Sequence, residues 1–151
     1  TYWPQLFLGI TFNYGLILGW TSIINEINII PLIFYAGTIF WTLGFDTIYG
    51  YQDIKDDEII GLKSTSIKFK SKPYTFLKIC YSIFLISLIL TGLLMKLNEF
   101  YFLSLLIVCF HMFFFQIKKL DIKKSNSCLS VFKSNNLLGL IILLSLLIGK
   151  F

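Results

Sequence analysis

The sequence has 151 residues, of which 56% are hydrophobic and only 14% are charged, and its mean hydropathy is +0.78. A soluble domain of this length carries about 25% charged residues, so the composition excludes an ordinary soluble domain and predicts an integral membrane protein. The net charge of +5 comes from thirteen lysines with no arginine. This charge favours an anionic membrane surface and anionic substrates, and we expect no nucleic-acid partner.

A helix that crosses the hydrocarbon core of a bilayer needs about 20 mostly apolar residues, and five segments approach that length. In chain order they are Pro4–Trp20, Ile29–Tyr51, Tyr74–Met95, Phe100–Gln116 and Leu137–Ile148. The last is too short alone, so we expect it to extend back through Val131–Asn136, with Asn135 and Asn136 as helix caps. The predicted fold is an all-α, multi-pass transmembrane helix bundle of about five spans.

The lysines predict how the bundle is oriented. If the five spans alternate in direction, eleven of the thirteen lysines fall on one side, in or beside the loops 53–72 and 117–133. The positive-inside rule makes that side the cytoplasm of a bacterial inner membrane, or the matrix side of a mitochondrial inner membrane.

Five of the eight acidic residues lie between positions 46 and 58, at the end of the second span: Asp46, Asp53, Asp56, Asp57 and Glu58. A carboxylate at bilayer depth costs at least ~2.5–3.5 kcal/mol. Two unit charges about 6 Å apart repel by roughly 3 kcal/mol at an effective dielectric near 20. The cluster therefore needs protons, lysines or a divalent metal. A solvated acidic loop is one alternative, although Asp46 lies too deep for it. A cation transporter segment is another, but it predicts acidic residues in several spans.

The spacing of these residues predicts a metal site. On one continuous helix Asp46, Tyr49, Gly50, Asp53 and Asp57 stand at i, i+3, i+4, i+7 and i+11, which places them on one face. Asp53 and Asp57 would be one turn apart, about 6 Å along the axis, and Gly50 would leave the face open to a ligand. Carboxylate oxygens suit Mg²⁺, which usually bridges to substrate phosphates.

Further polar residues are candidates for substrate binding. Lys63, Ser64 and Thr65 follow the acidic cluster and supply a cation and two hydroxyls, a set suited to a diphosphate. Asn13 is a polar residue inside the first span. It is a candidate for substrate contact, although polar residues also join helices in membranes.

The segment 46–65, DTIYGYQDIKDDEIIGLKST, resembles the second aspartate-rich motif of the UbiA superfamily of intramembrane prenyltransferases, and most of all its 4-hydroxybenzoate polyprenyltransferase branch. In that branch a Tyr-xxx-Asp-xxx-Asp core, here Tyr49, Asp53 and Asp57, lies between Asp-Thr and Ile-Gly-x-Lys-Ser-Thr. Residues 1–15 and 132–147 are similar to a middle helix and to the final helix of the family. The resemblance implies that residues 1–151 are the C-terminal part of a single domain, the last five helices of a nine-helix fold.

The family's first aspartate-rich motif, of the type Asn-Asp-xx-Asp, has no counterpart in this sequence. The opening TYWPQ, without an initiator Met or a basic leader, is what we expect of an internal cut. The sequence thus predicts a truncated product, or the second piece of a split gene that pairs with an N-terminal half. We expect the fragment alone to be inactive.

The resemblance implies a Mg²⁺-dependent transfer of a polyprenyl group from polyprenyl diphosphate to the aromatic ring of 4-hydroxybenzoate, in ubiquinone biosynthesis. It implies that Asp53 and Asp57 bind the metal, that Lys63 stabilises the leaving diphosphate, and that Asp46 and Tyr49 orient the acceptor. The phenylalanine-rich and leucine-rich spans would line a tunnel for the prenyl tail. Alternatives are a naphthoate, haem or chlorin acceptor, or an inactive relic.

Overall fold

The computed structural model describes all residues, 1–151, and consists of helices joined by short links, with no strand. The helices are α1 (Pro4–Phe12), α2 (Tyr14–Ile24), α3 (Ile29–Gly50), α4 (Ile54–Ile59), α5 (Thr65–Lys68), α6 (Pro73–Leu94), α7 (Glu99–Cys109), the π-helix η1 (Phe110–Gln116), α8 (Ile117–Lys119) and α9 (Ser125–Lys150).

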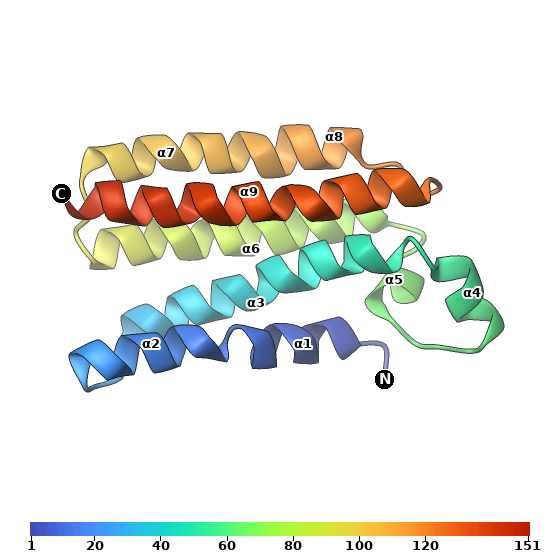
Figure 1. Ribbon diagram of the computed structural model, residues 1–151, viewed down its shortest axis with the longest axis horizontal. Coiled ribbons are helices and arrows are strands. Elements are labelled where there is room, and N and C mark those ends of the chain that lie inside the picture. Colours follow the sequence, from blue (N-terminus) through green and yellow to red (C-terminus); the bar gives the residue numbers. More distant parts are fainter.

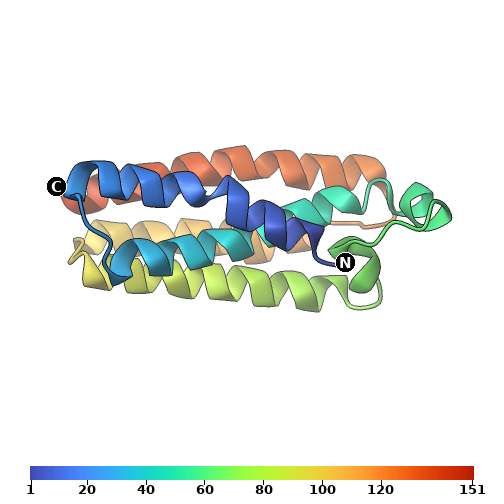
Figure 2. The ribbon, with the colours of Figure 1, turned by 90° about the horizontal axis from the view of Figure 1, so that it is seen from below.

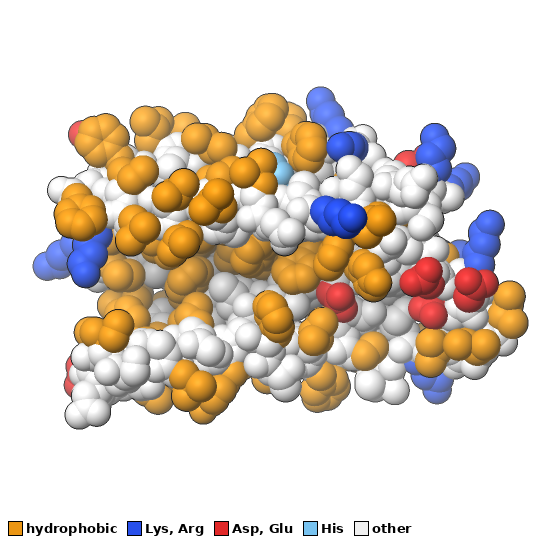
Figure 3. All heavy atoms as spheres, viewed as in Figure 1, with side chains coloured by type: hydrophobic (Ala, Val, Ile, Leu, Met, Phe, Trp, Pro, Cys, Tyr) orange, Lys and Arg blue, Asp and Glu red, His pale blue; other side chains and the backbone are white.

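Five helical segments are long and apolar enough to cross a membrane: Pro4–Ile24, Ile29–Gly50, Pro73–Leu94, Glu99–Lys119 and Ser125–Lys150. The prediction of an all-α bundle of five spans is thus confirmed. Figure 1 shows the long helices side by side, with α4, α5 and the link between α8 and α9 at the same end. Most of the charged side chains visible in Figure 3 gather at that end, while hydrophobic side chains cover the length of the helices.

Helix α3 lies between α1–α2 and α6 in both views of the bundle (Figures 1 and 2). Small residues let α3 and α6 approach closely: a Cβ added at Gly37 would lie closer than 3.0 Å to the side chain of Ser87. Farther along this contact, Trp41 of α3 stacks on Phe84 of α6 with 5.1 Å between ring centroids. Phe84 is fully buried. The α3–α6 pair is thus a rigid support for the residues at the end of α3.

The first predicted span is interrupted at Asn13, the residue between α1 and α2. The Asn13 carboxamide donates to the carbonyl oxygen of Gly9 at 2.8 Å, to that of Thr38 at 3.3 Å and to the hydroxyl of Thr42 at 2.8 Å. The side chain therefore ties the junction of α1 and α2 to α3, the helix-joining role that polar residues often have in membranes.

The last helix begins at Ser125, twelve residues before Leu137, so Asn135 and Asn136 lie in its middle. The prediction that they cap the helix was wrong. Asn135 is buried and accepts hydrogen bonds from Trp41 and Gln116 on other helices. An asparagine with partners on neighbouring helices does not need the free backbone groups of a helix end.

Candidate active site

The acidic cluster does not continue α3 as one helix. Helix α3 ends at Gly50, Tyr51–Asp53 form a turn, and α4 begins at Ile54 (Figure 1). The prediction that Asp46 and Asp57 share one helical face was therefore wrong. The turn is tight because the N–H groups of Tyr51 and Gln52 donate to the carbonyl oxygens three residues earlier, those of Ile48 and Tyr49, at 3.2 and 3.0 Å.

The two carboxylates of the predicted metal pair stay one turn apart in α4. Asp53 is the N-cap residue of α4, and its carbonyl oxygen accepts the N–H of Asp57 at 2.9 Å. Asp56 and Asp57 both lie in the first turn of α4, where negative charge is favourable next to the helix dipole. The spacing of this pair therefore survives the break, whereas Asp46 remains on α3, half-buried.

Most carboxylates in the cluster have no cationic partner, although lysines are abundant nearby. Glu58 pairs with Lys70 at 2.8 Å, and the only other ion pair joins Asp121 to Lys124 at 3.4 Å. Asp46, Asp53 and Asp57 accept no hydrogen bond to their side chains. No three Asp, Glu, His or Cys side chains lie close enough together to surround a metal ion. The chain thus offers a carboxylate pair, not a complete ligand set.

The hydroxyls that follow the cluster are used within the protein. Ser64 is the N-cap of α5, and its Oγ accepts the N–H of Ile67 at 3.3 Å. The Thr65 hydroxyl lies 2.6 Å from that of Thr47 on α3, and the Thr65 N–H donates to Gln5 Oε1 at 3.0 Å. Both residues are buried. These bonds fix α5 to α1 and α3. Lys63, just before α5, is exposed, with its Nζ 5.8 Å from the centre of the Tyr2 ring.

Gly50 is covered, contrary to the prediction that it leaves a helix face open to a ligand. A Cβ at this position would lie closer than 3.0 Å to Ser66 Oγ and 3.3 Å from Ser66 Cβ. The absence of a side chain at Gly50 lets α5 lie directly against the end of α3. The residue positions the loop, and the side on which a Cβ would lie is closed by Ser66.

A cavity of about 350 Å³ lies between α1, α3 and α9, farther along the bundle than the acidic cluster. Its lining combines aromatic and amide side chains: Phe12, Asn13, Trp41, Thr42, Phe45, Phe132, Asn135, Asn136 and Gly139. The surface in Figure 3 is hollowed between α9 and α1–α2, which border this cavity. Of the residues predicted to bind substrate, only Asn13 reaches it.

Four aromatic side chains connect the cavity to the acidic end, and we call them the aromatic row. Trp41 contacts Phe45 with 5.6 Å between centroids, Phe45 contacts Phe132 at 5.8 Å, and Phe132 contacts Tyr49 at 4.8 Å. Tyr49 is one turn from Asp53 in sequence and lies at the end of the row, 43% exposed. The four-residue spacing of Trp41, Phe45 and Tyr49 is a signal by which sequence reasoning could have found the row.

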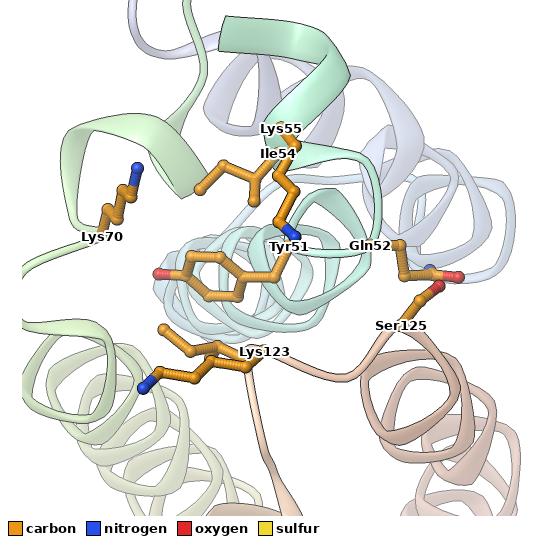
Figure 4. Close-up of a pocket in the computed structure, with 8 residues that line it drawn as sticks. Tyr51, Gln52, Ile54, Lys55, Lys70, Lys123 and Ser125 are labelled. Atoms are coloured by element: carbon orange, nitrogen blue, oxygen red, sulfur yellow. The ribbon is translucent and has the colours of Figure 1, made fainter.

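A second, larger cavity of about 600 Å³ opens at the loop end of the bundle. Figure 4 shows its lining residues, which come from the turn after α3, from α4, from the links after α5 and α8, and from the start of α9. Lys55, Lys70 and Lys123 make this cavity basic, and none of the predicted metal or catalytic residues lines it. Burial raises the pKa of the Tyr51 phenol in its wall, so this side chain stays neutral.

The sequence matches the UbiA prenyltransferase family over residues 1–143. The mitochondrial 4-hydroxybenzoate polyprenyltransferase of Bos taurus is 41% identical over 151 residues, which cover 99% of this chain and 40% of that protein. The mitochondrial 4-hydroxybenzoate polyprenyltransferase of Dictyostelium discoideum is 36% identical over 152 residues, covering 99% of this chain and 32% of that protein. The 4-hydroxybenzoate octaprenyltransferase of Francisella tularensis subsp. novicida (strain U112) is 36% identical over 142 residues, which cover 92% of this chain and 49% of that protein.

The chain thus spans between a third and a half of the length of these relatives. No solved structure matches it. With five helices long and apolar enough to cross a bilayer, it is an integral membrane protein. Because the family match extends over residues 1–143 of 151, the chain belongs to the UbiA prenyltransferase family.

Proposed function

We propose that this chain forms part of an enzyme that transfers a polyprenyl group from polyprenyl diphosphate to the aromatic ring of 4-hydroxybenzoate, a reaction of ubiquinone biosynthesis. The names of its relatives in Bos taurus and Francisella tularensis support this acceptor. We place the enzyme in a bacterial or mitochondrial inner membrane, with the lysine-rich end in the cytoplasm or matrix.

The observation that carries the proposal is a set of carboxylates without cations, connected by the aromatic row to an aromatic-lined cavity. Asp53 and Asp57 remain free of ion pairs in a chain with a net charge of +5. Unpaired carboxylates so close together repel each other. A site built to bind a cation explains why nearby lysines do not neutralise them.

Members of the UbiA family are generally dependent on divalent metal ions. We propose Mg²⁺ here, bound by Asp53 and Asp57. Magnesium keeps several waters and needs only one or two carboxylates when substrate phosphates supply other oxygens, so an incomplete protein ligand set fits this ion. When bound, Mg²⁺ would offset the negative charge that develops on the diphosphate as it leaves.

The chain's own residues would bind and orient the two substrates. Lys63 is exposed at the loop end and would contact the diphosphate. The aromatic row would lie along the first part of the prenyl chain and exclude water from the allylic carbon. Asp46, together with Tyr49 at the end of the row nearest the loop, would orient the hydroxybenzoate so that its ring carbon ortho to the phenol faces that allylic carbon.

Ser64 and Thr65 were predicted to contact the diphosphate, and Asn13 to contact substrate. Because Ser64 and Thr65 hydrogen-bond within the protein, we propose that they shape the diphosphate site by holding α5 in place. Asn13 joins α1–α2 to α3 and also lines the cavity. We therefore still propose that Asn13 contacts the prenyl chain, through the aliphatic part of the Asn13 side chain. We also propose that a further segment, similar to the remaining part of the longer relatives, supplies the other carboxylates.

The experiment compares metal-dependent donor binding and transfer in matched variants. The chain is placed in nanodiscs, alone and with an N-terminal segment of the Bos taurus relative, and supplied with geranylgeranyl diphosphate, 4-hydroxybenzoate and Mg²⁺. We expect transfer only with the added segment. Asp53→Asn or Asp57→Asn should lower transfer at least a hundredfold, whereas Asp56→Asn, rotated by about 100° from Asp57 on the helix, should retain most of it.

Two results would contradict the proposal. Equal losses in all three variants would mean that total charge matters and not the geometry of the Asp53–Asp57 pair. A naphthoate acceptor that is prenylated faster than 4-hydroxybenzoate would overturn the assignment of the acceptor.

A further inference from the structure

A chain of hydrogen bonds leads from the cavity into the core of the bundle. Trp41 Nε1 on α3 donates to Asn135 Oδ1 on α9 at 2.9 Å, and Gln116 Nε2, at the end of η1, donates to the same oxygen at 3.0 Å. Gln116 Nε2 also donates to Ser134 Oγ at 3.2 Å, and the Tyr81 hydroxyl of α6 donates to Gln116 Oε1. Four helical segments thus meet in one polar network.

The centre of the network is buried and its polar atoms are paired. Gln116 and Tyr81 are fully buried and Asn135 is 7% exposed. The Asn135 amide nitrogen is also used, because it donates to the carbonyl oxygens of Val131 and Phe132 at 3.3 and 3.1 Å. A buried network in which every member is satisfied fixes side-chain positions, whereas the loss of one member leaves its partners unpaired.

The π-helix places Gln116 in this network. Segment η1 has seven residues in π-helical geometry between α7 and α8. A π-turn holds more residues than an α-turn, so it changes which residue faces a neighbouring helix. Such turns often occur at functional sites. A change of one residue in register would rotate Gln116 by about 100° away from Asn135 and Tyr81.

Trp41 and Asn135 are the members of the network that reach the cavity, and Trp41 is the aromatic one. It lines the cavity between α1, α3 and α9, and its ring is held parallel to Phe84 with an interplanar angle of 2°. Asn135 accepts the only polar hydrogen of the indole. The Trp41 ring therefore presents aromatic carbon to the cavity and no unpaired N–H donor.

We propose that Asn135, supported by Gln116, is a positioning residue that holds Trp41 in the cavity wall and so adapts the cavity to the apolar prenyl chain of a prenyl diphosphate. This inference rests on the proposed function for the identity of the ligand. An unpaired indole N–H would favour either a water molecule in the cavity or a rotation of the ring. Both changes would disfavour a hydrocarbon chain beside the ring.

A spectroscopic experiment tests the contact itself. The chain with Trp3→Phe and Trp20→Phe retains Trp41 as its sole tryptophan, and ¹⁵N labelling of tryptophan gives one indole N–H signal. In Asn135→Leu we expect that signal to shift and its exchange with D₂O to accelerate at least tenfold. Ser145→Ala is the matched control, because Ser145 is a buried polar residue on the same helix that bonds only to Ile141 of that helix. An unchanged signal in Asn135→Leu would overturn the inference.

A binding experiment tests the consequence. Geranylgeranyl diphosphate is titrated with Mg²⁺ and without acceptor into the chain in nanodiscs, together with the added segment described above. We expect Asn135→Leu to raise Kd about tenfold and Trp41→Phe, which keeps an aromatic ring against Phe84, to raise it by a similar factor. The double variant should bind as weakly as either single variant, because both changes remove the same contact. The Ser145→Ala control should bind like the unmodified chain.

The outcomes separate this inference from the proposed function. If the unmodified protein does not bind geranylgeranyl diphosphate, the proposed function and this ligand both fail. If it binds, but Asn135→Leu changes the indole signal and keeps the original affinity, only the positioning role is overturned. Additive losses in the double variant would likewise overturn it, because Asn135 would then act independently of Trp41.

Discussion

Replacing Gly50 with alanine tests how the loop that carries the carboxylate pair is held against the bundle. Gly50 is the last residue of α3, and Ser66 of α5 lies against it. An alanine Cβ would lie closer than 3.0 Å to Ser66 Oγ, a separation that real Cβ atoms essentially never show. Since Ser66 is buried and its Oγ donates to the carbonyl oxygen of Thr47 on α3, relieving the clash breaks that bond by rotating the Ser66 side chain or shifting α5.

The expected cost follows from three contributions. Overpacking of this kind costs about 1–3 kcal/mol. The hydrogen bond from Ser66 Oγ to the carbonyl oxygen of Thr47, 3.0 Å long, would be lost at a cost of about 1 kcal/mol. Alanine favours the helix over glycine by about 1 kcal/mol. We therefore expect Gly50→Ala to lower the free energy of unfolding by about 1–3 kcal/mol.

The measurement is reversible unfolding in mixed micelles, followed by circular dichroism. Gly19→Ala on α2 is the control, because no atom lies within 4 Å of its added Cβ, and it should leave stability unchanged or slightly raised. Adding Ser66→Ala to Gly50→Ala removes the Oγ and should recover part of the loss. If Gly50→Ala is as stable as the unmodified chain but binds prenyl diphosphate more weakly, Gly50 faces the ligand and the packing argument is refuted.

Two further predictions concern the loop end of the bundle. Single cysteines at positions 56 and 124, in a chain without its three native cysteines, should be labelled from the same side of a sealed vesicle, and labelling from opposite sides would refute the shared location of the two loops. The Lys123 N–H and the Lys124 ammonium hold the pKa of Asp121 below its usual range. The ionised carboxylate therefore stabilises this loop above pH 4, and the stabilisation is lost as the pH falls through the lowered pKa. The protection of the Lys123 amide, measured as its hydrogen-exchange rate relative to an unprotected amide at the same pH, should fall on acidification, and Asp121→Asn should remove that pH dependence.

The five spans could be predicted from the sequence because hydropathy and length alone determine which helices suit a bilayer. The start of α9 could not be predicted in the same way. Its first turns contain serines and Lys133, and Asn135 and Asn136 look like residues of a helix end. Asn135 is instead paired with Trp41, 94 residues earlier. Local sequence cannot reveal a partner on a distant helix, so polar residues inside spans are the residues most easily misread.

The candidate site was predicted in part. The cluster of carboxylates is visible in the sequence, and the i, i+4 spacing of Asp53 and Asp57 remains in α4. The break between Gly50 and Ile54 was missed because the stretch contains no proline to end a helix. The role of Gly50 was missed as well, because its contact with Ser66 of α5 is not visible in the sequence. The aromatic row was missed because Phe132 comes from a different helix.

The break changes what the acidic cluster can do. On one continuous helix Asp46 and Asp57 would be about 16 Å apart along the axis, too far to act on one reacting centre. With the turn at Tyr51–Asp53, the Asp53–Asp57 pair moves onto a separate short helix at the loop end, while Asp46 stays on α3 beside the aromatic row. The charged part of the site, on α4, thus follows the apolar part, on α3, toward the loop end of the bundle. This order matches the proposed substrate, which has a charged head and a long apolar chain, and we propose that its reacting carbon lies where the two parts meet, next to Asp46 and Tyr49.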